Sequence, residues 1–212
     1  MARLRKVEQK QGRFHHGNLR QALIDGALLI LGKEGQGAIT LREVARRAGV
    51  THAAPYRHFD GKEALLAAVA EEGFHQLRHD MEAAATGDGD SLDRLQRFGE
   101  AYVRFALKNP AHYRLMYGPE FAHRAAHTAL QEASRRAFML LLDAVRECQE
   151  ARLVREGDPV HVALGMWSMV HGLSLLIMDR QMEDAGVGKG QSESVIRLAM
   201  TTLRDGLAAR KR

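Results

Sequence analysis

The apolar residues of this chain recur at helical spacing along its whole length, and no stretch alternates like a β-strand for more than a few residues. Glycines or prolines interrupt the pattern at 32–38, 85–91 and 109–110. With 212 residues, 45% of them hydrophobic and 27% charged, the chain has the composition of a globular protein. We therefore predict an all-α fold, in which the glycine-rich segment 85–91 separates a small N-terminal part from a larger C-terminal body.

Two short segments near the N-terminus have the pattern of a helix pair joined by a tight turn. Residues 40–49 begin with Thr40 and Glu43 at the spacing of a capping box and end at Gly49. Residues 51–59 follow at once and contain no Leu, Ile or Val, which a helix buried in a core would need. With the helix before them, these segments predict a three-helix module containing a helix-turn-helix, whose second helix lies in the DNA major groove.

All the excess positive charge lies in the first 60 residues. They hold 11 Lys and Arg against 5 Asp and Glu, a net charge of +6, whereas the whole chain carries +5. This asymmetry favours a polyanionic partner such as double-stranded DNA. Residues 1–16 are predicted to be a flexible basic arm, which either contacts DNA as N-terminal arms do or is a disordered solubilising tail.

Ten residues of the predicted helix-turn-helix are candidates for DNA contact. Ala53 is small enough to approach base edges, and His52 and Arg57 can bond to bases or phosphates. As predicted N-caps, Thr40 and Thr51 lie where free backbone N–H groups favour a phosphate. The full set is Thr40, Arg42, Thr51, His52, Ala53, Pro55, Tyr56, Arg57, His58 and Lys62.

Aromatic and methionine residues of the C-terminal half are candidates for an apolar pocket with a polar handle, as small-molecule sites usually are. The candidate ligand-binding residues are Tyr102, Tyr113, Met116, Trp167 and His171. Trp167 and His171 are four apart and should share one helix face. The alternative for each residue taken alone is that it belongs to the core.

The sequence predicts no enzyme, because it presents no Gly-rich phosphate loop, nucleophile elbow or spaced acid pair. No cofactor is predicted. Two histidine pairs, 75/79 and 123/127, have a spacing that can bind a metal, but they lack further ligands and no metal site is assigned. No unbroken apolar run approaches the roughly 18 residues of a membrane span. A cytoplasmic protein without a membrane partner is expected, and its single cysteine, Cys148, is expected to be buried.

The stretch TLREVARRAGVTHAAPYRHFDGKEALL, residues 40–66, resembles the TetR (tetracycline repressor) family of bacterial regulators. The resemblance lies in the order helix, turn, Tyr-x-x-Phe and then Lys-Glu-x-Leu, which opens a connecting helix. Further along, NPAHYRLMYG and WSMVHG are similar to the WHG type of C-terminal domain, named after Trp167, His171 and Gly172.

This resemblance implies a ligand-responsive homodimer, most often a repressor, that pairs through its last two helices and binds a palindromic operator. The expected parts are an arm (1–16), a helix-turn-helix (17–62), a connecting helix (63–86) and a C-terminal effector-binding and dimerisation domain (87–212). An effector would move the connecting helix and release the DNA. The alternatives are a regulator without a small ligand, switched by a protein partner or acting as an activator, and an enzyme or metal-binding body attached to a helix-turn-helix.

Overall fold

The computed structural model describes residues 19–121, 126–188 and 190–208, which excludes the predicted arm. These residues form helices and no β-strand. The α-helices are α2 (Leu19–Glu34), α3 (Leu41–Arg47), α4 (Lys62–Ala85), α5 (Ser91–Lys108), α6 (Pro110–Met116), α7 (Thr128–Glu150), α8 (Pro159–Met178) and α9 (Ser192–Leu207). Short 3-10 turns lie at Gln36–Ala38, Pro55–Arg57, Pro119–Phe121 and Glu183–Ala185. The predicted all-α fold is confirmed.

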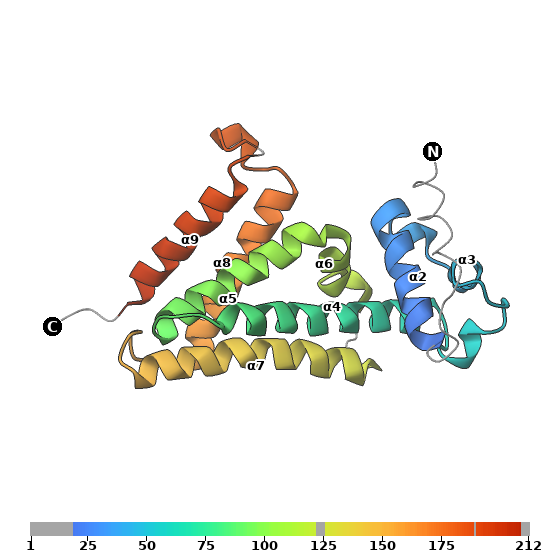
Figure 1. Cartoon of the computed structure of the whole chain (residues 1–212), viewed down its shortest axis with the longest axis horizontal. Helices are drawn as coiled ribbons and strands as arrows, with labels where there is room; N and C mark the ends of the chain where they lie inside the picture. Colours follow the sequence, from blue (N-terminus) through green and yellow to red (C-terminus); the bar gives the residue numbers. More distant parts are fainter. Residues whose placement is uncertain (1–18, 122–125, 189, 209–212) are drawn as a thin grey trace, which may run out of the picture.

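Helix α4 connects the two ends of an elongated molecule. It begins beside α2, close to α3, and continues into the body, where it packs against α5, α6 and α7 (Figure 1). Its buried side chains run from Leu65 near α2 to Phe74, Leu77 and Met81 in the body. The same helix therefore contributes to the core of both parts.

The glycine-rich segment 85–91, where the sequence predicts a division of the chain, is a turn that side-chain hydrogen bonds hold in place. It joins α4 to α5, and these two helices pack against each other. The guanidinium of Arg97 donates hydrogen bonds to the backbone carbonyls of Ala84 (2.9 Å) and Asp88 (3.1 Å). Asp90 opens α5 with a complete capping box. Sequence composition cannot show such a clamp, because Arg97 lies a full turn and more inside the next helix.

Helix α8 is long and apolar enough to cross a membrane by length and composition, with a mean hydropathy of 1.6 over its most apolar window. Only 33% of that window is buried. The helix packs against α5, α7 and α9. Its outer side keeps Val160, Leu164 and Leu176 exposed, at 36%, 40% and 42%. One side of α8 is thus core, and the other is an apolar surface on the outside of the chain.

Candidate functional site

The turn that follows α3 has the geometry of the predicted helix-turn-helix corner. Gly49 adopts the left-handed conformation, with φ of 67°. The Val50 N–H donates to the Ala45 carbonyl (3.0 Å) and the Gly49 N–H to the Arg46 carbonyl (3.3 Å). This pair of bonds closes a helix end and needs a residue that tolerates positive φ, which glycine does without strain. The predicted end of the first helix at Gly49 is confirmed.

The second segment of the pair is not an α-helix, contrary to the prediction for 51–59. Only Pro55–Arg57 forms a helical turn, of the 3-10 type, and it begins after Ala54. The carbonyl of Thr51 accepts the Ala54 N–H at 3.0 Å instead of opening an α-helical ladder. Pro55 is the residue whose N–H would bond to that carbonyl in an α-helix, and proline has no N–H. The predicted N-cap at Thr51 is therefore wrong.

The segment 51–58 nevertheless exposes its polar side chains and holds them on two buried anchors. Pro55 is buried, and Phe59 is 4% exposed beneath the Arg20 guanidinium, whose carbon lies 5.7 Å from the ring centroid. Tyr56 is 59% exposed. The other exposed residues of the segment are Thr51, His52, Ala53, Arg57 and His58. The structure thus places Pro55 inside the module and the remaining candidates of this segment on its surface.

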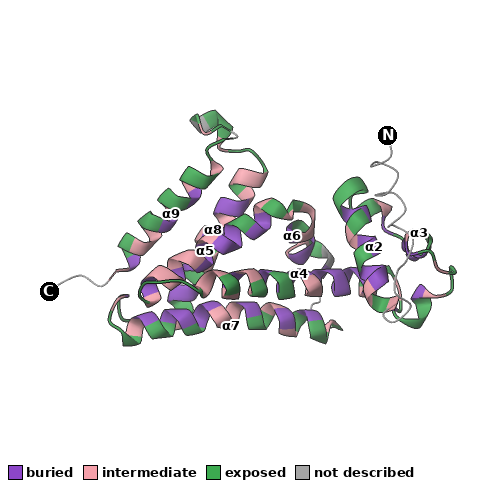
Figure 2. Ribbon diagram, viewed as in Figure 1, coloured by how far each residue is buried: buried purple, intermediate pink, exposed green. Residues whose placement is uncertain are grey.

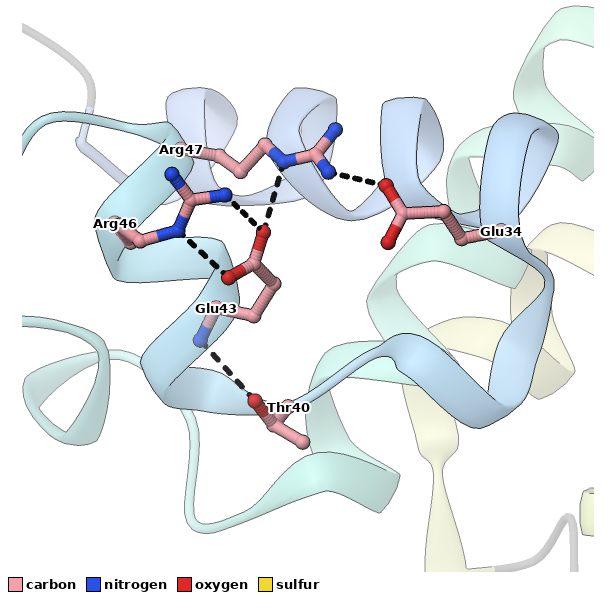
Figure 3. Close-up of polar contacts among 5 residues, drawn as sticks. All are labelled: Glu34, Thr40, Glu43, Arg46 and Arg47. Carbon is pink, nitrogen blue, oxygen red and sulfur yellow. Dashed lines mark hydrogen bonds and ion pairs between the residues drawn. The ribbon is translucent and has the colours of Figure 1, made fainter.

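Glu43 holds both arginines at the end of α3 (Figure 3). Its carboxylate accepts hydrogen bonds from Arg46 Nε (2.8 Å) and Arg47 Nε (2.9 Å), and Arg47 also pairs with Glu34. The hydrogen bonds from Arg46 and then Arg47 lower the pKa of Glu43 to about 2. Thr40 caps α3 by accepting the Glu43 N–H at 3.1 Å. The predicted capping box is only half formed, because the carboxylate faces the arginines.

Three exposed cations near the segment 51–58 are Arg42, Arg57 and Lys62. Within the described ranges Arg42 and Arg57 make no ion pair or side-chain hydrogen bond. The Lys62 ammonium donates to the Gln36 carbonyl at 3.2 Å, which leaves further N–H donors on that group. These three cations can contact phosphates, which position a protein on DNA without reading its sequence.

A cavity of about 280 Å³ lies in the body between α4, α5, α7 and α8. Its wall is almost entirely apolar and aromatic. It is lined by Phe74, Leu77, Met81, Phe98, Gly99, Tyr102, Tyr117, Ser134, Arg135, Ala137, Phe138, Leu141, Leu164, Met166, Trp167 and Val170. Tyr102 and Trp167, two of the candidate ligand-binding residues, are in this wall.

Four of the candidate ligand-binding residues join in one network of hydrogen bonds. Trp167 Nε1 lies 3.1 Å from the Tyr102 hydroxyl, which lies 2.9 Å from the Tyr113 hydroxyl. Nδ1 of His171 lies 2.6 Å from the Tyr113 hydroxyl and 3.1 Å from that of Tyr102. Because an indole N–H can only donate, the donor capacities favour the direction Trp167 to Tyr102 to Tyr113 to His171. Nδ1 is then the acceptor, and the ring proton lies on Nε2.

Burial keeps this relay, the network Trp167–Tyr102–Tyr113–His171, uncharged. It raises the pKa of both tyrosines well above the ordinary value, with a further contribution to Tyr102 from its phenol neighbours. It also lowers the pKa of His171. A neutral imidazole is what the relay requires, since an imidazolium has no lone pair to accept the Tyr113 hydroxyl proton.

The Tyr113 and His171 end of the relay faces a second pocket. Tyr113 and His171 line a space of about 460 Å³ between α6, α8 and the end of α2. Met116, the fifth candidate, lines neither hollow and is buried where α6 meets α4. A Cβ added to Gly73 of α4 would lie 2.5 Å from its sulfur, so the two helices approach closely there.

Sequence reasoning missed the residues that complete the cavity. Tyr117 lines both hollows, and its ring centroid lies 4.7 Å from that of His171 and 6.1 Å from that of Trp167. Phe138 of α7 lies 6.1 Å from Trp167, centroid to centroid. The helical spacing of Phe138 and Leu141 was a usable signal for a wall of the cavity. Tyr117 lies in the stretch NPAHYRLMYG quoted above, but it was not assigned a role in ligand binding.

The histidine pairs make carboxylate contacts. His75 lies 3.6 Å from Glu71, and His127 lies 2.9 Å from Glu63, while residue 123 is outside the described residues. Among the residues that are described, no group of three or more His, Cys, Asp and Glu could hold a metal ion. Cys148 is buried, as predicted, and burial raises the pKa of its thiol.

Comparisons with known proteins cover both halves of the chain. Residues 23–69 match the family model of bacterial regulatory proteins, tetR family, and residues 95–203 match the model of the tetracyclin repressor-like C-terminal domain. The HTH-type transcriptional regulator BetI of Rhizobium meliloti (strain 1021) is 32% identical over 158 residues, which cover 73% of this chain and 75% of BetI. The nucleoid occlusion factor SlmA of Vibrio cholerae is 26% identical over 141 residues, 66% of this chain and 71% of SlmA. A solved structure of unknown function from Rhodococcus sp. RHA1 is 35% identical, with a TM-score of 0.82 over 93% of this chain and 99% of that one.

Proposed function

The chain belongs to the TetR family of bacterial transcriptional regulators, and we propose that it is a homodimeric repressor that a small molecule releases from a palindromic operator. Its family models and relatives are DNA-binding regulators and not enzymes, in agreement with the sequence-based prediction. The observation that carries the proposal is the course of α4, which presents Lys62 beside the exposed segment 51–58 and lines the cavity with Phe74, Leu77 and Met81.

The exposed segment 51–58 supports two kinds of DNA contact. His52 and Ala53 lie ahead of the buried Pro55 and would face base edges, where a donor or a small apolar group distinguishes base pairs. Tyr56, Arg57 and Lys62 would contact phosphates. Arg46 and Arg47 are not included, because Glu43 and Glu34 already hold them.

The outer surface of the last two helices supports the homodimer. Six large hydrophobic side chains are exposed among the described residues, and four of them lie on α8 and α9. These four are Val160, Leu164, Leu176 and Leu198, the last 68% exposed. Figure 2 shows that much of the α9 ribbon is exposed. Pairing through this surface would give a two-fold dimer, whose symmetry matches a palindromic operator.

The cavity supports release by a ligand. A molecule in the cavity would touch α4, and α4 begins at the DNA-binding end of the molecule. A typical coupling of about 1 to 3 kcal/mol would weaken operator binding about five- to 150-fold, which is enough to switch a promoter.

The first test is binding to the DNA that flanks the gene, compared with a scrambled duplex by fluorescence anisotropy between about 50 and 200 mM salt. Binding that stays tight and sequence-dependent at the high-salt end is expected. Weak binding with equal affinity for both duplexes would contradict operator recognition. Loss of the complex on adding an effector separates a ligand-responsive repressor from a regulator switched by a protein partner.

Substitutions distinguish base contacts from phosphate contacts. Tyr56→Phe and Lys62→Gln should lower affinity alike on all duplexes, and Lys62→Gln should reduce the salt slope by about 1. His52→Ala and Ala53→Val should change which bases are preferred. Lys108→Gln, at the exposed end of α5 in the body, is the matched control and should leave both properties unchanged. Equal effects of both groups on every duplex would show that the assigned roles are wrong.

A further inference from the structure

We propose that the cavity of the C-terminal body binds an amphiphilic anion, an apolar chain or ring of about nine or ten non-hydrogen atoms whose single acidic group lies at the cavity mouth beside Arg135. The inference rests on the proposed function, since it takes this cavity as the effector site. It adds the chemical class of the ligand, its approximate size and its orientation.

The inner part of the cavity accepts only an uncharged group. Two polar residues of the wall, Tyr102 and Trp167, are engaged in the relay, with Trp167 Nε1 donating to the Tyr102 hydroxyl at 3.1 Å. Tyr102 is 5% exposed, and the pKa of its hydroxyl is raised by burial, so a negative charge is disfavoured there. His171 is neutral for the same reason and offers an anion no positive charge. The hydroxyls of Tyr117 and Ser134 are uncharged, and Phe74, Phe98 and the aliphatic residues of the wall offer apolar contact.

Arg135 marks the mouth of the cavity. It is the single charged residue among the described residues of the lining, and its side chain is 60% exposed. Leu164 of α8, also in the lining, is 40% exposed. The cavity therefore opens between α7 and α8, where the ligand would keep its polar end in water.

The positively charged group at the mouth is the guanidinium of Arg135. Glu132 is shared by two arginines on the same helix, with Arg135 Nε and Arg136 Nε each 2.8 Å from a carboxylate oxygen. The hydrogen bonds from Arg135 and then Arg136 lower the pKa of Glu132 to about 2, so the carboxylate is ionised at neutral pH. Arg135 uses Nε (2.8 Å) and one terminal nitrogen (2.9 Å) for Glu132, and its other terminal nitrogen keeps N–H donors for a further anion. A guanidinium donates to a carboxylate or phosphate and repels an ammonium group.

The volume of the cavity sets the size of the apolar part. A water-sized group occupies about 30 Å³ in a liquid, so a cavity of about 280 Å³ has room for roughly nine of them. Each buried methylene should raise affinity about fourfold until the cavity is full. Longer chains should gain little, because their further methylenes stay in water.

The test uses the full-length protein and the fluorescence of Trp167. This residue is the only tryptophan in the chain and lies in the cavity wall, so its emission reports on the cavity directly. Straight-chain carboxylates from hexanoate to tetradecanoate are titrated below their micelle concentrations, together with the matching alcohols and alkyltrimethylammonium ions. Affinity should rise with chain length, level off near decanoate, and be about three- to fivefold higher for the carboxylate than for the alcohol at low salt.

Two neighbouring variants test the role of Arg135. Arg135→Gln should reduce decanoate affinity to that of decanol without changing decanol binding. Arg136→Gln also removes a guanidinium from Glu132, but Arg136 does not line the cavity, so it should keep most of the preference for decanoate. Equal binding of decanoate and decanol to the wild type, or equal effects of the two variants, would overturn the acidic head group. The absence of saturable binding by any carboxylate, in fluorescence and in calorimetry, would overturn the whole inference.

Fluorescence anisotropy of the operator duplex, measured in the same samples, tests release from DNA independently of ligand binding. If decanoate binds as expected and the DNA complex persists, the ligand class stands and the release mechanism is wrong. If the ammonium amphiphile releases DNA while carboxylates do not bind, release stands and the anionic ligand is wrong.

Discussion

At the scale of single residues, the relay shows what helical spacing can and cannot predict. Trp167 and His171 share a face because they are four apart, and the structure brings Tyr102 and Tyr113 to the same place. Spacing could not show that Tyr102 lines the cavity while Tyr113 lies behind it, because that depends on how α5 and α6 cross. Met116 lies at another contact altogether, and its proposed ligand role stays a prediction.

The two half-buried histidines, His112 and His171, should make stability depend on pH. Burial lowers the pKa of both His112 and His171, so below about pH 6.5 the unfolded chain binds protons that the folded protein does not. The free energy of unfolding should therefore be at its full value near pH 7.5 and fall as the pH is lowered through the ordinary histidine range. Urea unfolding at pH 7.5 and 5.5 measures this difference.

His112→Gln and His171→Gln should each reduce that pH dependence, whereas His161→Gln, whose side chain is 81% exposed, is the control. The carboxylates of Glu43 and Glu132 affect stability over a different pH range. The pKa values of Glu43 and Glu132 are lowered to about 2, so whatever they contribute is present above about pH 4.5 and is lost as the pH falls towards 2. An unfolding free energy that is equal at pH 7.5 and 5.5 would contradict the histidine argument.

At the scale of elements, local sequence signals were reliable for helix ends and misleading where two signals competed. Gly49 was predicted correctly as a helix end, because glycine adopts the left-handed conformation of that turn without strain. In the segment 51–59 the apparent N-cap favoured a helix and Pro55 opposed it. The α-helix does not form, because Pro55 lacks the N–H that would bond to the Thr51 carbonyl, and an N-cap does not replace that bond.

Gly49→Ala should destabilise the DNA-binding end of the molecule by about 1 kcal/mol or more, because alanine is strained at positive φ. Gly32→Ala is the matched control. It lies inside α2 with open space around the added Cβ, and it should stabilise by about 0.5 to 1 kcal/mol. Thermal unfolding of both variants and their operator affinities measure the difference. Shifts of the same sign would show that the Gly49 turn is not needed for this fold.

At the scale of the whole molecule, the sequence could predict the order of the parts but not how they join. The composition of 85–91 suggested a boundary, and only Arg97, contributed from within α5, shows that this segment belongs to the body. The cavity likewise depends on four helices that are far apart in the sequence. No local pattern contains that information.

The proposed dimer has a direct test on the surface of α8 and α9. Leu176→Glu and Leu198→Glu should shift the protein from dimer to monomer in light scattering at micromolar concentration, because each places a charge in a surface meant to be buried. Operator affinity should fall with the loss of the second half-site contact. Leu29→Glu is the matched control, because Leu29 is 51% exposed on α2, away from this surface. A monomeric wild type, or an equal effect of Leu29→Glu, would contradict pairing through the last two helices.

The hydrogen bonds from Arg97 to the end of α4 affect how a displacement along α4 would be transmitted. Arg97 fixes the carbonyls of Ala84 and Ala85, so α4 is a rod of 24 residues that is anchored at one tip. At 1.5 Å per residue, Phe74 lies about 16 Å from the anchor and Lys62 about 35 Å from it. A sideways push of 1 Å at Phe74 on a rigid rod of this kind therefore becomes about 2 Å at Lys62. In the proposed release mechanism, α4 would therefore convert a small displacement at the cavity into a larger one at the DNA-binding end.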